Sequence, residues 1–213
     1  MNPANRLAQL SFTAGPAALL GGWVLMRPTE GDLGPGPWWT AGHALWLAGF
    51  LMFGVMILAM RALAGPVRGG RRVAVEAVTG VALFGVAANV TQLVIDLYAG
   101  LTAVDGEAMR ALLAQVKGYP GVEPVVYTPG GQVFFGAVLA LAFVLALLRR
   151  VTPVSAAVTG GGVVLLGVAT FQEGGQGTAL AAVGMAVMWL GTLLVGRGSS
   201  GGGGLGATTP SKA

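Results

Sequence analysis

The sequence contains no cysteine and only one histidine. The absence of cysteine excludes disulfide bonds, cysteine-ligated zinc and iron–sulfur clusters, because each of these needs cysteine sulfur. One histidine is also too few for bis-histidine haem or for a conventional zinc site. The sequence further lacks a Walker loop and a dinucleotide-binding fingerprint. We therefore expect this protein to bind no metal and no cofactor.

Charged residues are scarce as well. They make up 9% of the 213 residues, whereas 54% are hydrophobic, and the mean hydropathy is +0.76. Soluble globular domains carry about 25% charged residues, so this chain cannot cover a water-facing surface. The lipid bilayer is therefore its expected partner. The net charge of +4 does not indicate nucleic-acid binding, because the arginines stand at the ends of apolar stretches, where they set orientation.

Six apolar stretches separated by loops predict an all-α integral membrane protein with six transmembrane helices. The expected spans are residues 7–26, 38–63, 73–97, 132–148, 153–171 and 178–195. Together with their loops they form one membrane domain, residues 1–195. The Gly- and Ser-rich segment 196–213 has nothing with which to form a core, so we expect a disordered cytoplasmic tail.

Basic residues alternate between the two sides of these spans. With the N-terminus inside, the outer side receives only three basic residues: Arg27, Arg110 and Lys117. The inner side receives nine: Arg6, Arg61, Arg68, Arg71, Arg72, Arg149, Arg150, Arg197 and Lys212. This bias predicts a multi-pass protein of the plasma membrane with both termini in the cytoplasm. The excess of arginine over lysine, with abundant Gly and Ala, is typical of GC-rich bacterial genomes.

The loop expected on the outer side, residues 102–131, is the longest non-spanning segment. Asp105 has the position and chemistry of an N-cap, and Gly118 ends the segment that follows it. Apolar residues recur between them at helical spacing, at Met109, Leu112, Leu113 and Val116. We interpret this segment as a short amphipathic helix over the bundle or at the membrane surface, with a lid or docking role as the alternative. Residues 125–128, between two prolines, are expected to be extended.

Polar side chains within a span are costly, and they are therefore functional candidates. Asn89, Gln92 and Asp96 are spaced i, i+3 and i+7 in the third span, which places them on one helix face. His43 lies at a depth similar to that of Asp96, about one helical turn below the outer surface. Three more polar residues stand near this level at the ends of other spans: Arg27, Gln132 and Glu173.

These residues predict a polar site that opens to the outer side. A carboxylate next to His43 would favour the charged imidazolium, and such a pair can relay a proton or gate a cavity. The alternative is that Asp96 pairs with Arg27 or His43 and only joins helices.

Two features of the inner half of the spans are interpreted as structural. Glu76 has Arg72 at i−4 and Arg61 at the end of the second span as partners for an ion pair. The three glycines at 160–162 permit close helix contact. A hinge in the fifth span is the alternative for these glycines.

No segment carries a motif that indicates a particular enzymatic reaction. The leading hypothesis is a non-enzymatic accessory or structural membrane protein, with other membrane subunits or a second copy of the chain as its partners. One alternative is a carrier or channel for a proton or small solute that uses His43 and Asp96. A second alternative is a membrane enzyme acting on a lipid-type substrate, for which the same pair would have to supply the acid and the base.

Overall fold

Every secondary-structure element in the described part of the chain is a helix. The computed structural model describes residues 3–27, 34–128, 130–172 and 174–200, and no β-strand occurs in these ranges. The helices are α1 (Pro3–Leu25), α2 (Pro37–Leu63), α3 (Gly70–Thr102), α4 (Gly106–Lys117), η2 (Val122–Tyr127), α5 (Gly130–Leu147), α6 (Pro153–Ala169) and α7 (Gly174–Ser200). Of these, η2 is a π-helix.

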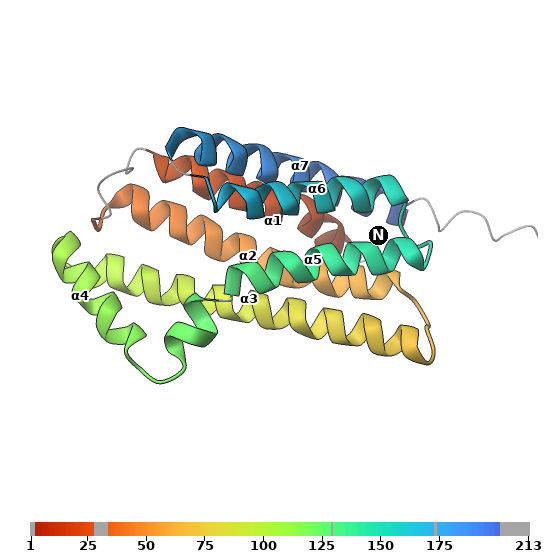
Figure 1. The fold of residues 1–213 in the computed structure, drawn as a ribbon, viewed down its shortest axis with the longest axis horizontal. Helices are drawn as coiled ribbons and strands as arrows, with labels where there is room; N and C mark the ends of the chain where they lie inside the picture. Colours follow the sequence, from red (N-terminus) through yellow and green to blue (C-terminus); the bar gives the residue numbers. More distant parts are fainter. Residues whose placement is uncertain (1–2, 28–33, 129, 173, 201–213) are drawn as a thin grey trace, which may run out of the picture.

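The long helices lie side by side along the longest axis of the molecule (Figure 1). α1 packs against α2 and α7, α7 against α6, α6 against α5, α5 against α3, and α3 against α2, so that the helices form a closed ring. α4 and η2 contact α3 and lie at one end of the bundle (Figure 1). This end therefore holds the segments that surround the expected polar site.

One apolar core fills the centre of the ring and draws side chains from all six long helices. Near its middle, the rings of Phe50, Phe53 and Phe134 pack with their centroids between 4.9 and 5.6 Å apart. Gly85 allows this arrangement, because a Cβ atom there would lie 2.7 Å from the Cα atom of Phe134. α3 and α5 thus come into close contact at a position where α3 has no side chain.

The outer surface of the bundle is apolar as well. Within the described residues, four helical segments are long and apolar enough to cross a membrane: Pro37–Leu63, Gly70–Thr102, Val122–Leu147 and Gln176–Gly198. α6 is apolar but shorter. Large apolar side chains such as Leu51, Phe143 and Leu190 are exposed on these helices. Their exposure is unfavourable in water but not in lipid. The chain is an all-helical protein with the features of a membrane-embedded one.

The amphipathic helix expected in the outer loop is present as α4. It spans Gly106–Lys117, and the Asp105 side chain caps it by accepting a hydrogen bond of 2.8 Å from the amide of Ala108. Met109 is buried and packs in a small apolar cluster with Trp39 and Ala99. α4 therefore covers the ends of α2 and α3.

The expectation of an extended segment at residues 125–128 is wrong. Residues Val122–Tyr127 form the π-helix η2, and the amide of Thr128 donates to the carbonyl of Glu123, five residues earlier. Gly121 starts this turn with a φ of 88°, a conformation that glycine adopts without strain. Pro124 falls in its first turn, where a missing N–H leaves no hydrogen bond unmade.

The expectation of disorder from residue 196 is also wrong for its first residues, because α7 continues to Ser200. Gly196 lies against α1, where an added Cβ atom would stand 3.1 Å from Cβ of Phe12. The glycine that suggested a flexible tail is thus part of a close contact between α7 and α1. Residues 201–213 lie outside the described part of the chain. α3 is longer than predicted too, since Ala99 and Gly100 remain buried in its last turns.

The glycines at 160–162 differ in what surrounds them. A Cβ atom on Gly162 would overlap the backbone of Met188 in α7, whereas one on Gly161 would meet nothing within 4 Å. Gly191 on α7 lies equally close to the backbone of Thr159 on α6. α6 and α7 are therefore held together through backbone contact, as small residues permit in membrane helices.

Gly162→Ala is expected to lower the stability of the protein by about 1–3 kcal/mol, because its methyl group would force α6 away from α7. Gly161→Ala is the matched control, and we expect it to leave stability unchanged or to raise it by less than about 1 kcal/mol, since alanine favours the helix. Thermal unfolding of both variants in the same detergent measures the difference. Equal melting temperatures would contradict the close contact.

Candidate functional site

The structure brings His43 and Asp96 together at the end of the bundle that carries α4 and η2, which is the end expected on the outer side. His43 lies on α2 and Asp96 on α3, and their exposed fractions are 4% and 7%. The Nε2 atom of His43 stands 4.0 Å from Oδ2 of Asp96. This separation allows electrostatic attraction between the two groups, but it is longer than a direct hydrogen bond.

A second contact fixes the orientation of the imidazole. The Nδ1 atom of His43 lies 2.9 Å from the carbonyl oxygen of Trp39, one turn earlier on α2. A carbonyl oxygen only accepts hydrogen bonds, so Nδ1 is the nitrogen that carries the proton. The nitrogen that gains or loses a proton is therefore Nε2, which faces the carboxylate of Asp96.

Two tryptophans enclose this imidazole. The Trp39 ring stacks on His43 with centroids 3.9 Å apart and an interplanar angle of 27°, and the Trp46 ring meets it edge-on at 5.2 Å. Trp39 also donates a hydrogen bond from Nε1 to the backbone carbonyl of Asp96, at 3.4 Å. Gly100 leaves space for the Trp39 ring, because an added Cβ atom would lie 2.5 Å from its Cδ1 atom. The rings thus hold α2 against α3 and cover the pair.

Tyr127 completes the site from the outer loop. Its hydroxyl group donates a hydrogen bond of 2.9 Å to Oδ1 of Asp96. The Lys117 ammonium group, at the end of α4, lies 4.3 Å from the centre of the Tyr127 ring, a cation–π distance. Asp96 therefore connects α3 to both the outer loop and α2.

Sequence reasoning did not assign Tyr127 or Trp39 to the site. Tyr127 was hidden because an extended strand at residues 125–128 gave no reason to direct its hydroxyl toward α3. One signal was available, since an aromatic ring with a polar tip is the residue type that joins an apolar region to a wet one.

Two other predicted residues lie on the same face of α3. Asn89 is buried, and its Nδ2 atom donates to the carbonyl of Gly85 on its own helix, at 2.7 Å. Gln92 lies one helical turn before Asp96, with its side chain beside the carboxylate. The Asn89 side chain thus makes its hydrogen bond within its own helix, whereas the Gln92 side chain lies beside the Asp96 carboxylate.

The remaining predicted residues are located elsewhere or lie outside the described chain. Gln132 is exposed and lines a groove of about 630 Å³ with apolar residues of α5, α6 and α7, such as Phe135 and Leu166. The Arg27 guanidinium group lies 3.9 Å from the centre of the Trp23 ring, and its Nε atom donates to the Trp23 carbonyl. Glu173 lies outside the described residues. The site as formed is therefore smaller than the one predicted.

The inner end of α2 and α3 carries the ion pair expected for Glu76. Arg61 donates from Nε to Oε2 at 3.0 Å and from Nη2 to Oε1 at 2.5 Å. Arg61 rather than Arg72 is thus the partner that binds both carboxylate oxygens, in the fork geometry typical of arginine. This pair joins α2 to α3 at the end opposite to His43 and Asp96.

Comparison of the chain with protein-family models, curated proteins and solved structures finds no match. Within the described residues, no three His, Asp or Glu side chains gather where they could hold a metal ion. His43, Asp96 and Tyr127 form the polar cluster with the greatest functional potential at this end of the bundle. Chemically, this group can join helices, or it can exchange a proton between Nε2 and the carboxylate.

Tyr127→Phe is expected to loosen the outer loop by about 1 kcal/mol, because it removes the hydroxyl donor to Asp96 and keeps the ring. Hydrogen exchange of the η2 amides in detergent-purified protein measures this change. Tyr119→Phe is the control, since Tyr119 is 59% exposed in the same loop. Equal exchange rates in the two variants would show that the hydroxyl does not hold the loop.

Proposed function

We propose that this chain is a six-span protein of the plasma membrane with both termini in the cytoplasm. α1 has 23 residues and α6 has 17, and at 1.5 Å per residue they are about 35 and 25 Å long. The first of these lengths crosses the hydrocarbon core of about 30 Å, and the second crosses it where the bilayer thins. Both helices run beside the longer apolar helices (Figure 1), which supports their assignment as spans.

The distribution of charge supports the proposed orientation. Four segments lie together at one end of the bundle (Figure 1): the start of α1, the α2–α3 turn, the α5–α6 turn and the end of α7. These segments hold eight of the nine basic residues expected inside, and the ninth, Lys212, lies outside the described residues. Such a concentration of arginine is typical of the cytoplasmic side.

We infer that the protein acts as a structural or accessory component of the membrane and not as an enzyme. This role is supported by the contacts that the polar atoms of the candidate site make within the protein. Nδ1 of His43 binds its own helix, Oδ1 of Asp96 binds Tyr127, and the Trp39 and Trp46 rings cover the imidazole. These contacts join α2, α3 and η2 and leave the pair buried, whereas a catalytic pair must meet its substrate.

A carrier of protons or small solutes is the second candidate. The distance of 4.0 Å between Nε2 of His43 and Oδ2 of Asp96 favours it, because a small side-chain movement or one bridging water would connect the two groups, and they are not locked in a direct hydrogen bond.

The absence of cysteine makes the topology directly testable by labelling. Single substitutions Val104→Cys and Phe171→Cys should react with a membrane-impermeant maleimide in intact cells, since both positions are exposed in segments assigned to the outer side. Arg6→Cys and Arg72→Cys should react only after the membrane is permeabilised. Labelling of Phe171→Cys from the inner side alone would remove α6 from the set of spans.

A double-mutant cycle tests the structural role of the pair. Asp96→Asn and His43→Gln should each lower the melting temperature, and the double variant should cost less than the sum by about 0.5 kcal/mol or more, because the residues interact. In proteoliposomes, we expect wild type, Asp96→Asn and the control Glu76→Gln to show the same proton flux as empty vesicles. A pH-dependent flux that occurs in wild type and Glu76→Gln but disappears in Asp96→Asn would favour the carrier instead.

A further inference from the structure

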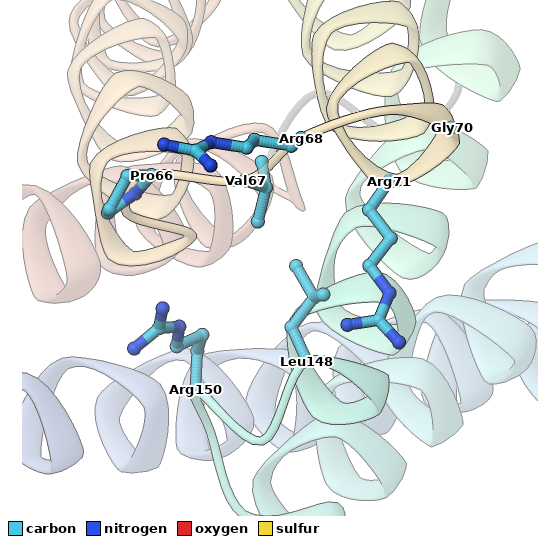
Figure 2. A pocket seen from close by; sticks show the side chains of 7 residues that line it. All are labelled: Pro66, Val67, Arg68, Gly70, Arg71, Leu148 and Arg150. Atoms are coloured by element: carbon cyan, nitrogen blue, oxygen red, sulfur yellow. The ribbon is translucent and has the colours of Figure 1, made fainter.

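The inner end of the bundle contains a cavity that the candidate site does not involve. It has a volume of about 660 Å³ and lies between the α2–α3 turn and the end of α5. Its lining residues are Pro66, Val67, Arg68, Gly70, Arg71, Leu148 and Arg150 (Figure 2). Three of these seven residues are arginines, and they come from three separate parts of the chain: the α2–α3 turn, the start of α3 and the α5–α6 turn.

The three arginines line different sides of the cavity because different segments carry them. Figure 2 shows Arg68 and Arg71 on the α2–α3 side of the cavity and Arg150 on the opposite side, with Leu148 between Arg71 and Arg150. The Arg150 guanidinium group reaches across to Gly65, where an added Cβ atom would lie 3.3 Å from Nη2. Gly65 has a φ of 64°, so glycine both forms this turn and leaves space for the guanidinium group.

No carboxylate among the described residues lines this cavity. Glu76, the acidic residue of the inner half of α3, is already bound by Arg61. The positive charges of the three guanidinium groups are therefore left for a ligand.

Backbone groups around the cavity also favour an anion. The lining includes Gly70, the first residue of α3, so the positive end of that helix dipole faces the cavity. The carbonyls of Leu145 and Ala146 at the end of α5 accept hydrogen bonds from the amides of Arg150 and Arg149. This reduces the negative charge that the end of α5 would otherwise present.

We propose that this three-arginine cavity binds a phosphate group, carried either by an anionic phospholipid headgroup or by a free phosphate ion. Guanidinium groups bind phosphate oxygens through paired, charge-assisted hydrogen bonds. Basic cavities between the cytoplasmic ends of membrane helices are places where phosphorylated lipid headgroups bind. Arginines that only orient the chain in the membrane need not line a common cavity. Arg72 and Arg149 are examples, because neither lines this cavity.

Those two arginines provide a matched control. The test variant is Arg71→Gln with Arg150→Gln, and the control is Arg72→Gln with Arg149→Gln, which removes the same charge one residue away in the same two segments. Delipidated full-length protein is titrated with phosphatidylglycerol in mixed micelles, with phosphatidylcholine as the uncharged comparison, and separately with inorganic phosphate. Native mass spectrometry counts bound lipid, and calorimetry measures phosphate binding.

We expect phosphatidylglycerol or inorganic phosphate to bind wild type and the control variant with affinities within about twofold of each other. Binding to the test variant should be at least about tenfold weaker, the change caused by losing one charge-assisted hydrogen bond. The probe that shows this difference identifies the source of the phosphate. Arg68→Gln serves as an independent variant if the test variant does not purify as a folded protein, and its affinity should fall likewise. Binding of neither probe to wild type, or equal weakening in test and control variants, would overturn the proposal.

Discussion

Close backbone contact between helices is the interaction on which the rest of this structure depends. Lipid does not drive apolar helices together as water does, so packing must supply the attraction, and small residues allow it. Gly162 and Gly191 let α6 and α7 touch, and Gly85 lets α3 reach Phe134 on α5. Gly100 has the most direct consequence, because it admits the Trp39 ring, which stacks on His43 and binds the backbone at Asp96. The arrangement of the polar site thus depends on the absence of a side chain at Gly100.

Ionisable side chains have different surroundings at the two ends of the bundle. At the outer end, His43 and Asp96 are buried and satisfied within the protein, and α4 and η2 fold over this end. At the inner end, the guanidinium groups of Arg68, Arg71 and Arg150 surround an open cavity without a carboxylate in its described lining. A buried polar group must find its partners inside the protein, whereas a charge at the membrane surface is free to bind a ligand or lipid headgroup. The contrast is consistent with the proposal of a structural role at one end and phosphate binding at the other.

The sequence predicts those features that depend on periodicity and local chemistry. The bounds of α2 and α4 follow from apolar spacing and from the Asp105 cap, and the similar depths of His43 and Asp96 pointed to one site. The periodicity of the sequence does not show which helices pack against each other or how a turn folds. For this reason Gln132, at a similar expected depth, faces a groove between α5, α6 and α7 instead. Tyr127 was missed because a proline-containing π-turn and an extended strand have the same local composition.

Two pairs of oppositely ionisable side chains in the described part of the chain join the same two helices. Arg61 binds Glu76 at the inner ends of α2 and α3, and His43 faces Asp96 at their outer ends. The contacts of α3 with α5 around Gly85 and of α6 with α7 around Gly162 are made by close apolar and backbone packing. A polar contact has a specific partner and direction, whereas apolar packing tolerates sliding. These pairs fix the register of α2 against α3. Tyr127 and Arg150 reach these two helices from the outer loop and the α5–α6 turn, so both the site and the cavity are built on the α2–α3 pair.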